Sequence, residues 1–329
     1  MGHSNISIFV PHLGCPHQCS FCNQKHITGC VEQPKAKDID DAVNIALSSK
    51  NFNSSDAEIA FFGGSFTAIE SSYMLELLSS ASKYVKNHTV SGIRISTRPD
   101  CINTEVLEIL KEYGVTSIEL GAQSMIDEVL IANNRGHKSL DVVHASKLIK
   151  DYGFSLGLQM MTGLYASSKE YDIATATEII KLDPDTVRIY PTITIKNTYL
   201  EKLYLEGLYS PPTLEDSVAL AVILEDMFTA ANISVIRVGL HSIEADSYVA
   251  GPWHPAFREL CESYRFRLKF DNILEEGKTY NIYVSSSDVS KVIGQNRSNI
   301  NYFKQKKITI KIIPDYMVNK SDFTIEEVN

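Results

Sequence analysis

The stretch Glu58-Ile59-Ala60-Phe61-Phe62 is a mostly apolar run, and Gly63-Gly64-Ser65-Phe66-Thr67 follows it directly. Such a run is typical of a buried strand. The paired glycines predict a turn whose backbone can approach a ligand closely, because no Cβ stands in the way. The same unit, an apolar run followed by a polar or glycine-rich turn, recurs along the chain and predicts the fold.

Seven runs of this kind are candidate strands: Ile6–Val10, Glu58–Phe62, Gly92–Ser96, Ser117–Leu120, Ser155–Met161, Thr186–Tyr190 and Ile233–Val238. Helical patterns lie between them, near Asp38–Ser49, Ser71–Lys86, Thr104–Tyr113, Ser124–Ala132, Leu140–Tyr152, Lys169–Leu182 and Leu214–Ala231. This alternation predicts parallel βαβ units and a full or partial TIM-type (β/α) barrel over residues 1–260. An open doubly wound sheet is the alternative, since periodicity does not separate the two. In a barrel, the loops that follow the strands share one face and line one cavity.

Three cysteines lie close behind the first run: Cys15, Cys19 and Cys22. Three thiolates can hold three irons of a [4Fe–4S] cube and leave the fourth iron open to a small molecule, whereas ferredoxin-type clusters normally carry four thiolates. The alternative is a zinc site, whose fourth ligand would be His12, His17 or Cys30.

Composition narrows the class of protein. The chain has 329 residues, 44% of them apolar, and a net charge of −9. We expect no membrane span and no signal peptide, and six cysteines without a disulfide-like arrangement favour the cytoplasm. The acidic balance argues against indiscriminate nucleic-acid binding, but residues 291–313 carry six Lys or Arg and no Asp or Glu. That segment is either a docking patch or an ordinary solvated surface.

Several polar residues stand at the predicted strand ends. Arg98 can clamp a carboxylate or pair with Asp100. Glu119 and Gln123 suit ribose hydroxyls or a substrate, or they brace the structure. Tyr190 can relay an electron or hydrogen atom, or it is a wall residue.

Taken in order, several of these segments resemble the radical S-adenosylmethionine (radical SAM) enzymes, in the branch that contains the catalytic subunit of Elongator and its shorter bacterial relatives. The resemblance covers about residues 5–260 and rests on the cysteine spacing and on the segments 61–67, 96–100, 119–124, 135–137, 188–192 and 237–240. It implies a [4Fe–4S] cluster held by the three cysteines. It also implies reductive cleavage of S-adenosylmethionine to a 5′-deoxyadenosyl radical.

The resemblance further implies site residues. Cofactor-binding positions are Phe21, Gly63, Gly64, Ser65, Ser96, Arg98, Glu119 and Gln123. Ser65 departs from the family pattern, which usually has an acidic residue there. Tyr190 and Arg98 are the candidate catalytic residues. A one-electron donor protein is an expected partner.

The remaining segment, 261–329, is predicted to be a small α/β extension that resembles a KH-type RNA module. Its Gly294-Gln295-Asn296-Arg297 stretch keeps only the first glycine of the G-x-x-G loop. Five basic residues are candidate RNA contacts: Lys291, Arg297, Lys304, Lys306 and Lys307. A capping domain is the alternative.

Three functions follow from these observations. The first is a radical SAM enzyme that modifies RNA, most plausibly a tRNA base. The second is the same chemistry on a peptide or small metabolite, and the third is a non-catalytic module stabilised by zinc. Elongator-type enzymes carry an acetyltransferase domain, for which the segment after residue 260 is too short. Either a separate acyl-group donor enzyme is a further partner and supplies that step, or the reaction differs.

Overall fold

The computed structural model describes residues 4–11, 18–23, 33–50, 52–240, 243 and 245–328. Cys15, His12, His17 and Cys30 lie outside the described residues, so the predictions that involve them concern positions about which the structure says nothing. The chain divides into two compact units. Unit 1 comprises Met1–Thr213 and Asp226–Trp253, and unit 2 comprises Leu214–Glu225 and His254–Asn329.

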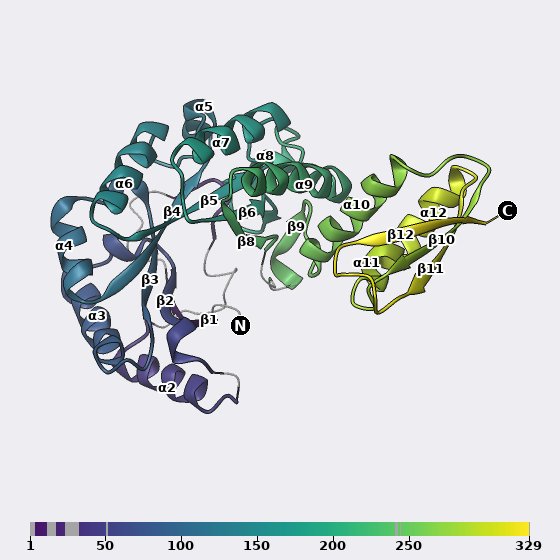
Figure 1. The fold of residues 1–329 in the computed structure, drawn as a ribbon. Helices are drawn as coiled ribbons and strands as arrows, with labels where there is room; N and C mark the ends of the chain where they lie inside the picture. The colour runs from purple at the N-terminus through teal and green to yellow at the C-terminus, as the bar shows by residue number, and fades with distance from the viewer. Residues whose placement is uncertain are drawn as a thin grey trace. The chain divides into compact units, whose positions relative to one another are not determined.

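Unit 1 is built on a seven-stranded parallel sheet that curls into a partial barrel (Figure 1). Its strands, in spatial order, are β1 (Ser4–Val10), β2 (Ala57–Gly63), β3 (Gly92–Thr97), β4 (Val115–Gln123), β5 (Ser155–Thr162), β6 (Thr186–Pro191) and β8 (Ser234–Val238). Each adjacent pair is parallel. The predicted partial TIM-type barrel is confirmed.

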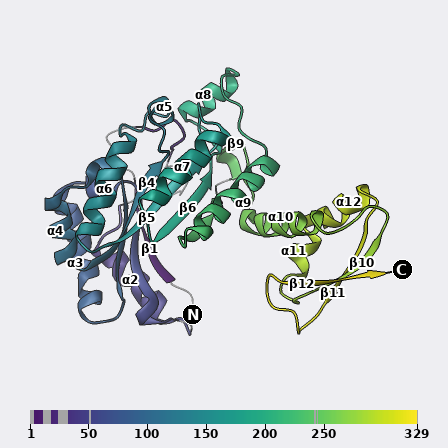
Figure 2. The same ribbon diagram turned by 45° about the horizontal axis from the view of Figure 1, so that its top comes forward.

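Helices connect the strands and cover the outer face of the curved sheet (Figures 1 and 2). They are α2 (Ala36–Leu47), α3 (Ser71–Lys86), α4 (Thr104–Glu112), α5 (Asp127–Ala132), α6 (Ser139–Asp151), α7 (Lys169–Lys181), α8 (Tyr199–Leu205) and α9 (Leu214–Ala230). A short ribbon of β7 (Thr194–Ile195) and β9 (Tyr248–Ala250) completes the unit. Helix α9 contributes its first residues, Leu214–Glu225, to unit 2.

Local sequence explains where these elements end. The Asn103 side chain accepts a hydrogen bond from the Val106 N–H and caps α4. Gly114 and Gly153 follow α4 and α6 with φ of 83° each, a conformation that glycine adopts without strain. The helix predicted from Ser124 begins later, at Asp127, because β4 runs on to Gln123 before the chain turns.

Strand β2 shows why the sheet forms. Its first five residues, 57–61, are all buried, so both faces of the strand are covered. The same is true of residues 117–120 in β4. Parallel strands buried on both faces read as continuous apolar runs, which is the pattern that revealed them in the sequence.

Unit 2 contains a three-stranded sheet in the order β11-β10-β12. Its elements are α10 (Phe257–Asp271), β10 (Thr279–Val284), α11 (Val289–Ile293), α12 (Ser298–Gln305), β11 (Thr309–Pro314) and β12 (Phe323–Val328). Strands β10 and β11 are parallel, and β12 runs antiparallel to β10. A separate apolar core includes Phe270, Ile282 and Phe303, all 0% exposed. The boundary predicted after residue 260 lies within α10.

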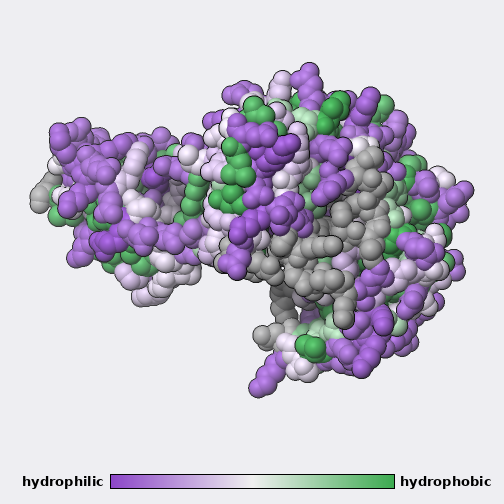
Figure 3. All heavy atoms as spheres, turned by 180° about the vertical axis from the view of Figure 1, so that it is seen from behind, coloured by the Kyte–Doolittle hydropathy of each residue, from purple (hydrophilic) through white to green (hydrophobic). Residues whose placement is uncertain are grey.

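Short 3-10 turns complete the description: Ser54–Asp56, Phe66–Ala68, Pro99–Cys101, Ala245–Ser247 and Gln295–Arg297. No helix among the described residues is long and apolar enough to span a membrane. The face seen in Figure 3 is largely hydrophilic, with hydrophobic residues in small, separate groups.

Candidate functional site

The cysteine segment is fixed by hydrogen bonds to a distant part of unit 1. Cys19 is 5% exposed and Cys22 is half-buried. The Cys22 N–H donates to the Cys19 carbonyl at 3.1 Å, which closes a tight turn between the two thiols. Ser20 is bound twice by Asn133: its N–H donates to the Asn133 carbonyl at 3.0 Å and its hydroxyl to Oδ1 at 2.6 Å. The Asn134 amide donates to the Gln18 carbonyl at 2.9 Å.

The glycine turn lies beside this segment because β2 pairs with β1. Gly63 has φ of 118°, and the Gly64 N–H donates to the Val10 carbonyl at 3.0 Å. A Cβ added at Gly63 would lie 2.4 Å from the Val10 carbonyl oxygen. Only glycine allows the two backbones to come this close.

Ser65 takes part in a buried hydroxyl network. Its Oγ lies 2.8 Å from Thr97 Oγ1 and accepts a hydrogen bond from the Arg98 N–H at 3.1 Å. Thr67 Oγ1 lies 2.6 Å from the same Thr97 oxygen and donates to the Cys101 carbonyl. The network ties the turn after β2 to the turn after β3.

These turns line a cavity of about 170 Å³ at the carboxyl ends of β2 to β5. Its lining includes all the predicted cofactor and metal positions that the structure describes: Cys19, Phe21, Cys22, Gly63, Gly64, Ser65, Ser96, Arg98, Glu119 and Gln123. Iron–sulfur clusters are held by cysteine thiolates. Two thiols and a bare glycine backbone opening into one cavity form a donor set that fits a cluster with a small-molecule ligand.

Arg98 is held by an acidic neighbour. Its Nε and Nη2 donate to the two carboxylate oxygens of Asp100, both at 2.9 Å. Burial works against the charge on Arg98, but Asp100 and the nearby Cys19 outweigh it and raise the pKa of Arg98. Nη1 is buried and has no hydrogen-bond partner among the described residues. The ion-pair alternative therefore describes Arg98 here, and its Nη1 group is left without a partner among the described residues.

Glu119 connects strands of the sheet through ion pairs, the structural role that the sequence analysis gave as its alternative. It accepts hydrogen bonds from Arg94 at 3.0 Å and from Arg188 at 2.7 and 2.8 Å. Arg94 also donates to Glu58 at 2.7 Å, which completes a row of four buried charges across β2, β3, β4 and β6. Burial is the largest single effect on Glu58 and opposes its charge, but Arg94 and two hydroxyls together lower the pKa of Glu58.

Two predicted aromatic positions differ in where they lie. Phe21 lines the cavity, and it packs against Leu200 and Leu203 and also against the cluster of Val129, Met161 and Leu164. Tyr190 is not among the described residues that line the cavity; it packs against Val129, Met161 and Leu164. Burial raises the pKa of Tyr190. This is the wall position that the sequence left as an alternative.

Arg135 also lines the cavity, although the sequence analysis gave it no role. Its Nη1 donates to Cys19 Sγ at 3.0 Å and its Nη2 to the Gly121 carbonyl at 2.7 Å. The residue is 6% exposed. It stands in the quoted segment 135–137, but no spacing rule links it to a cysteine 116 positions earlier. His137, two residues on, is buried, with Nε2 3.3 Å from the Ala122 carbonyl.

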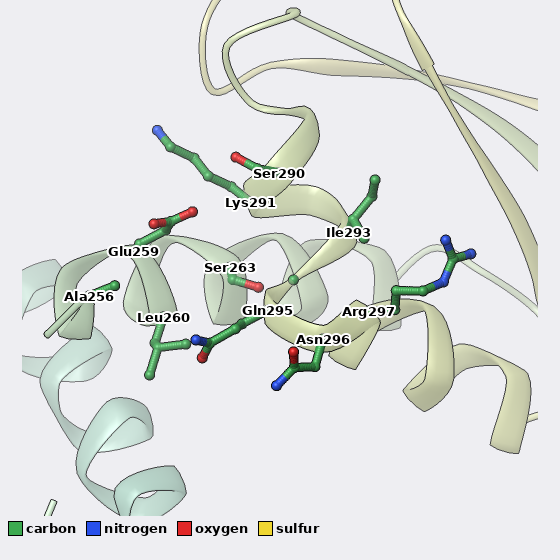
Figure 4. Close-up of a pocket in the computed structure, with 11 residues that line it drawn as sticks. Ala256, Glu259, Leu260, Ser263, Ser290, Lys291, Ile293, Gln295, Asn296 and Arg297 are labelled. Carbon is green, nitrogen blue, oxygen red and sulfur yellow. The ribbon is translucent and has the colours of Figure 1, made fainter. Parts of the chain in front are cut away.

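A second pocket, of about 330 Å³, lies within unit 2 between α10 and the turn that joins α11 to α12 (Figure 4). Gly294, Asn296 and Arg297 all have positive φ in this turn. Arg297 points away from Gln295 and Asn296 (Figure 4).

The five basic residues predicted to contact RNA differ in their charge environment. Three of them are in ion pairs: Lys291 with Glu262 and Asp288, Lys306 with Asp271, and Lys307 with Glu276. Arg297 and Lys304 are exposed, and neither has an ion-pair partner in the part of the chain that the structure describes. Of the five predicted residues, these two therefore keep a positive charge that no described carboxylate neutralises.

Comparison with known proteins shows which family the chain matches. Residues 9–176 match the model of the radical SAM superfamily, and residues 184–266 match the radical SAM C-terminal domain. The chain is 34% identical over 127 residues to a tRNA uridine(34) acetyltransferase of Dehalococcoides mccartyi, covering 38% of this chain and 28% of that protein. It is 29% identical over 228 residues to Elongator complex protein 3 of Dictyostelium discoideum, covering 62% of this chain and 40% of that protein. The chain thus spans less than two thirds of both relatives.

The structure of Methanocaldococcus infernus Elp3 with an N-terminal deletion has a similar fold. Its TM-score is 0.63 at 21% identity, with 82% of this chain and 64% of that chain covered. The superfamily match spans more than half of the chain and includes the cysteine segment and the glycine turn, which excludes the non-catalytic zinc module. The chain belongs to the radical SAM superfamily of enzymes, whose cofactors are a [4Fe–4S] cluster and S-adenosylmethionine.

Proposed function

We propose that this radical SAM enzyme modifies RNA in the cytoplasm, and that its substrate is a tRNA base. The observation that carries the proposal is the pairing of a radical SAM site in unit 1 with relatives whose names refer to uridine 34 of tRNA. Unit 2 supports it as well, because Arg297 in the turn between α11 and α12 and Lys304 in α12 are exposed and have no ion-pair partner among the described residues.

Each part of the unit 1 site has a task in this proposal. Cys15, Cys19 and Cys22 hold the cluster, and the backbone of Gly63-Gly64 receives the methionyl amine of S-adenosylmethionine. When bound, the cluster supplies one electron for reductive cleavage of S-adenosylmethionine. Phe21 and the apolar residues behind it keep water from the cavity, which protects a reactive site from side reactions.

The Ser65 hydroxyl network supports this task. Because Ser65 and Thr97 are already hydrogen-bonded to each other, the turns after β2 and β3 are fixed before a cofactor arrives. Ser65 replaces the acidic residue of the usual pattern, so we assign recognition of the amine to backbone carbonyls of the turn. Arg98 contributes its Nη1 donor to this region, and Tyr190 stays a wall residue.

The turn between α11 and α12, which carries Arg297, and the last turn of α12, which carries Lys304, are the proposed contacts for the RNA backbone. Arg297 and Lys304 are exposed and meet phosphates, while Lys291, Lys306 and Lys307 contribute less because carboxylates already neutralise them. The proposal includes two partner proteins. One is a one-electron donor. The other, for an acyl transfer such as the name of the tRNA uridine(34) acetyltransferase indicates, is a separate acyl-group donor enzyme.

The test begins with anaerobic reconstitution using iron and sulfide, followed by reduction with dithionite in the presence of S-adenosylmethionine. Mass spectrometry then measures 5′-deoxyadenosine with and without tRNA from cells that lack the protein. We expect product that requires Cys15, Cys19 and Cys22, and a tRNA nucleoside whose mass changes only with active protein. Cleavage together with identical nucleosides in the two cell types would refute a tRNA substrate.

Binding is tested separately through the salt dependence of tRNA affinity. The Arg297→Ala/Lys304→Ala variant should bind more weakly, with a salt slope lower by about 0.7–0.9 for each lost phosphate contact. Lys278→Ala is the matched control, because Lys278 is already paired with Glu275 and Glu327. Equal affinities for the double variant and the control would remove unit 2 from the RNA contact.

A further inference from the structure

Arg135 is a buried cation held in one orientation. It follows the turn after α5 and is 6% exposed. Four hydrogen bonds fix it. Its Nη1 donates to Cys19 Sγ at 3.0 Å and its Nη2 to the Gly121 carbonyl at 2.7 Å. Its backbone N–H donates to the Leu130 carbonyl at 3.0 Å, and its own carbonyl oxygen accepts from Arg98 Nη2. A Cβ added at Gly121 would lie 2.9 Å from Gln123 Nε2 and 3.4 Å from Arg135 Nη2.

The backbone on both sides of this contact is tied down as well. Asn133 holds Ser20, the residue after Cys19, and Asn134 holds Gln18, the residue before it. Asn133 is anchored in turn by its amide, which donates to the Val129 and Tyr165 carbonyls, both at 2.8 Å. The geometry between Arg135 and Cys19 is therefore set by bonds that flank both residues.

Arg135 differs from the other buried arginines in what neutralises it. Arg98 is paired with Asp100, Arg188 with Glu119, and Arg94 with two glutamates. Arg135 has no carboxylate partner among the described residues, and its buried Nε has no hydrogen-bond partner there. An unpaired buried charge is costly. The only sulfur that it contacts among the described cysteines is Cys19, so the missing negative charge belongs at that sulfur.

We infer that Arg135 tunes and positions the iron–sulfur cluster by donating to the sulfur of Cys19. A [4Fe–4S] cluster with three thiolate ligands is anionic and gains a further negative charge when it takes up one electron. A hydrogen bond and a fixed positive charge at a ligand sulfur stabilise the reduced form more than the oxidised form. Arg135 thereby raises the midpoint potential, and the cluster accepts an electron from a weaker donor. The inference rests on the family's cofactor and not on the identity of the substrate.

The test is anaerobic potentiometry of the reconstituted protein, with the reduced cluster followed by electron paramagnetic resonance in the absence of S-adenosylmethionine. Arg135→Gln removes the charge, and Arg135→Lys keeps it without the forked geometry. We expect midpoint potentials in the order wild type, Arg135→Lys, Arg135→Gln, from least to most negative, at equal iron and sulfide content per chain. Arg237→Gln on β8, at the opposite edge of the sheet from β1, is the matched control and should leave the midpoint unchanged.

Two results would overturn the inference. The first is an unchanged midpoint in Arg135→Gln with a full cluster, which would make Arg135 a structural residue only. The second applies if Arg135→Gln does not load a cluster: Arg135→Met then serves as the neutral variant, and an unchanged midpoint in it refutes the tuning role. Neither S-adenosylmethionine cleavage nor RNA modification enters the readout, so failure here leaves the proposed function intact.

Discussion

Replacing Glu119 by glutamine removes one of two negative charges from the buried row formed by Glu58, Arg94, Glu119 and Arg188. The row is balanced, with two carboxylates and two guanidinium groups. In the variant Arg94 keeps Glu58 at 2.7 Å, so Arg188 is the group that loses its ion-pair partner. We expect the substitution to lower the free energy of unfolding of unit 1.

The size of the effect follows from burial. The side chains of Glu119 and Arg188 are 5% and 11% exposed, so solvent does not replace the lost partner. Removing one member of a buried pair typically costs about 3–5 kcal/mol. The glutamine carbonyl still accepts one hydrogen bond, so we expect a loss near the lower end, about 3 kcal/mol. That is a large share of the total stability of an ordinary domain, which is about 5–15 kcal/mol.

The assay is urea unfolding of the protein without cofactors, followed by tryptophan fluorescence. The chain has one tryptophan, Trp253, and it belongs to unit 1. The double variant Glu119→Gln/Arg188→Met should recover part of the loss, because it also removes the stranded charge. Glu178→Gln is the reference, since Glu178 and Lys181 are exposed, and it should change stability by less than about 0.5 kcal/mol. Two results would refute the reasoning. One is a loss in the free energy of unfolding below about 1 kcal/mol for Glu119→Gln. The other is a loss in the double variant that equals the sum of the losses in the two single variants.

Three further predictions concern unit 1 and the remaining cysteines. Gly63→Ala should destabilise the protein by about 2 kcal/mol or more, because it adds a collision with the Val10 carbonyl to the strain of a positive φ. Gly153→Ala is the control for the strain alone, because the space around its Cβ is open. Equal losses of the two variants in urea unfolding would contradict the collision. Burial and two neighbouring arginines lower the pKa of His137 to about 4, so the unfolded chain binds this proton more readily. The stability that neutral His137 provides should be complete above about pH 6.5 and be lost as the pH falls toward 4, and His137→Gln should flatten that part of the pH profile unless another group produces it. Cys261 is 0% exposed and burial raises its pKa to about 12, so iodoacetamide at pH 8 should label it only after unfolding, whereas rapid labelling of folded protein would contradict the buried position.

The fold could be predicted from the sequence because strands that are buried on both faces form continuous apolar runs. The seven predicted strands all form, and their ends differ from prediction by a few residues at most; Ser117–Leu120, for example, is the centre of the longer β4. Since parallel strands end at one face, the turns at Gly63 and Arg98 were expected to meet, and they line one cavity. The chemical roles assigned to these residues stay predictions.

What the sequence did not reveal depends on contacts between distant residues. No periodicity links Arg135 to Cys19, or Glu119 to Arg188, because each pair meets only after several strands have assembled. The prediction made from the basic composition of residues 291–313 was incomplete for the same reason. Lys306 and Lys307 are neutralised by Asp271 and Glu276, acidic residues more than 30 positions earlier in the chain.

The hydrogen bonds that Asn133 makes to Ser20 also bear on the order of events during synthesis. Ser20 leaves the ribosome 113 positions ahead of its partner Asn133. At usual translation rates this interval lasts roughly 6 to 20 s. Contacts of such long sequence separation form late in folding, because the intervening chain must be ordered first. The thiols thus emerge before the turn that orients them exists, and cluster insertion belongs after the first four strands have assembled.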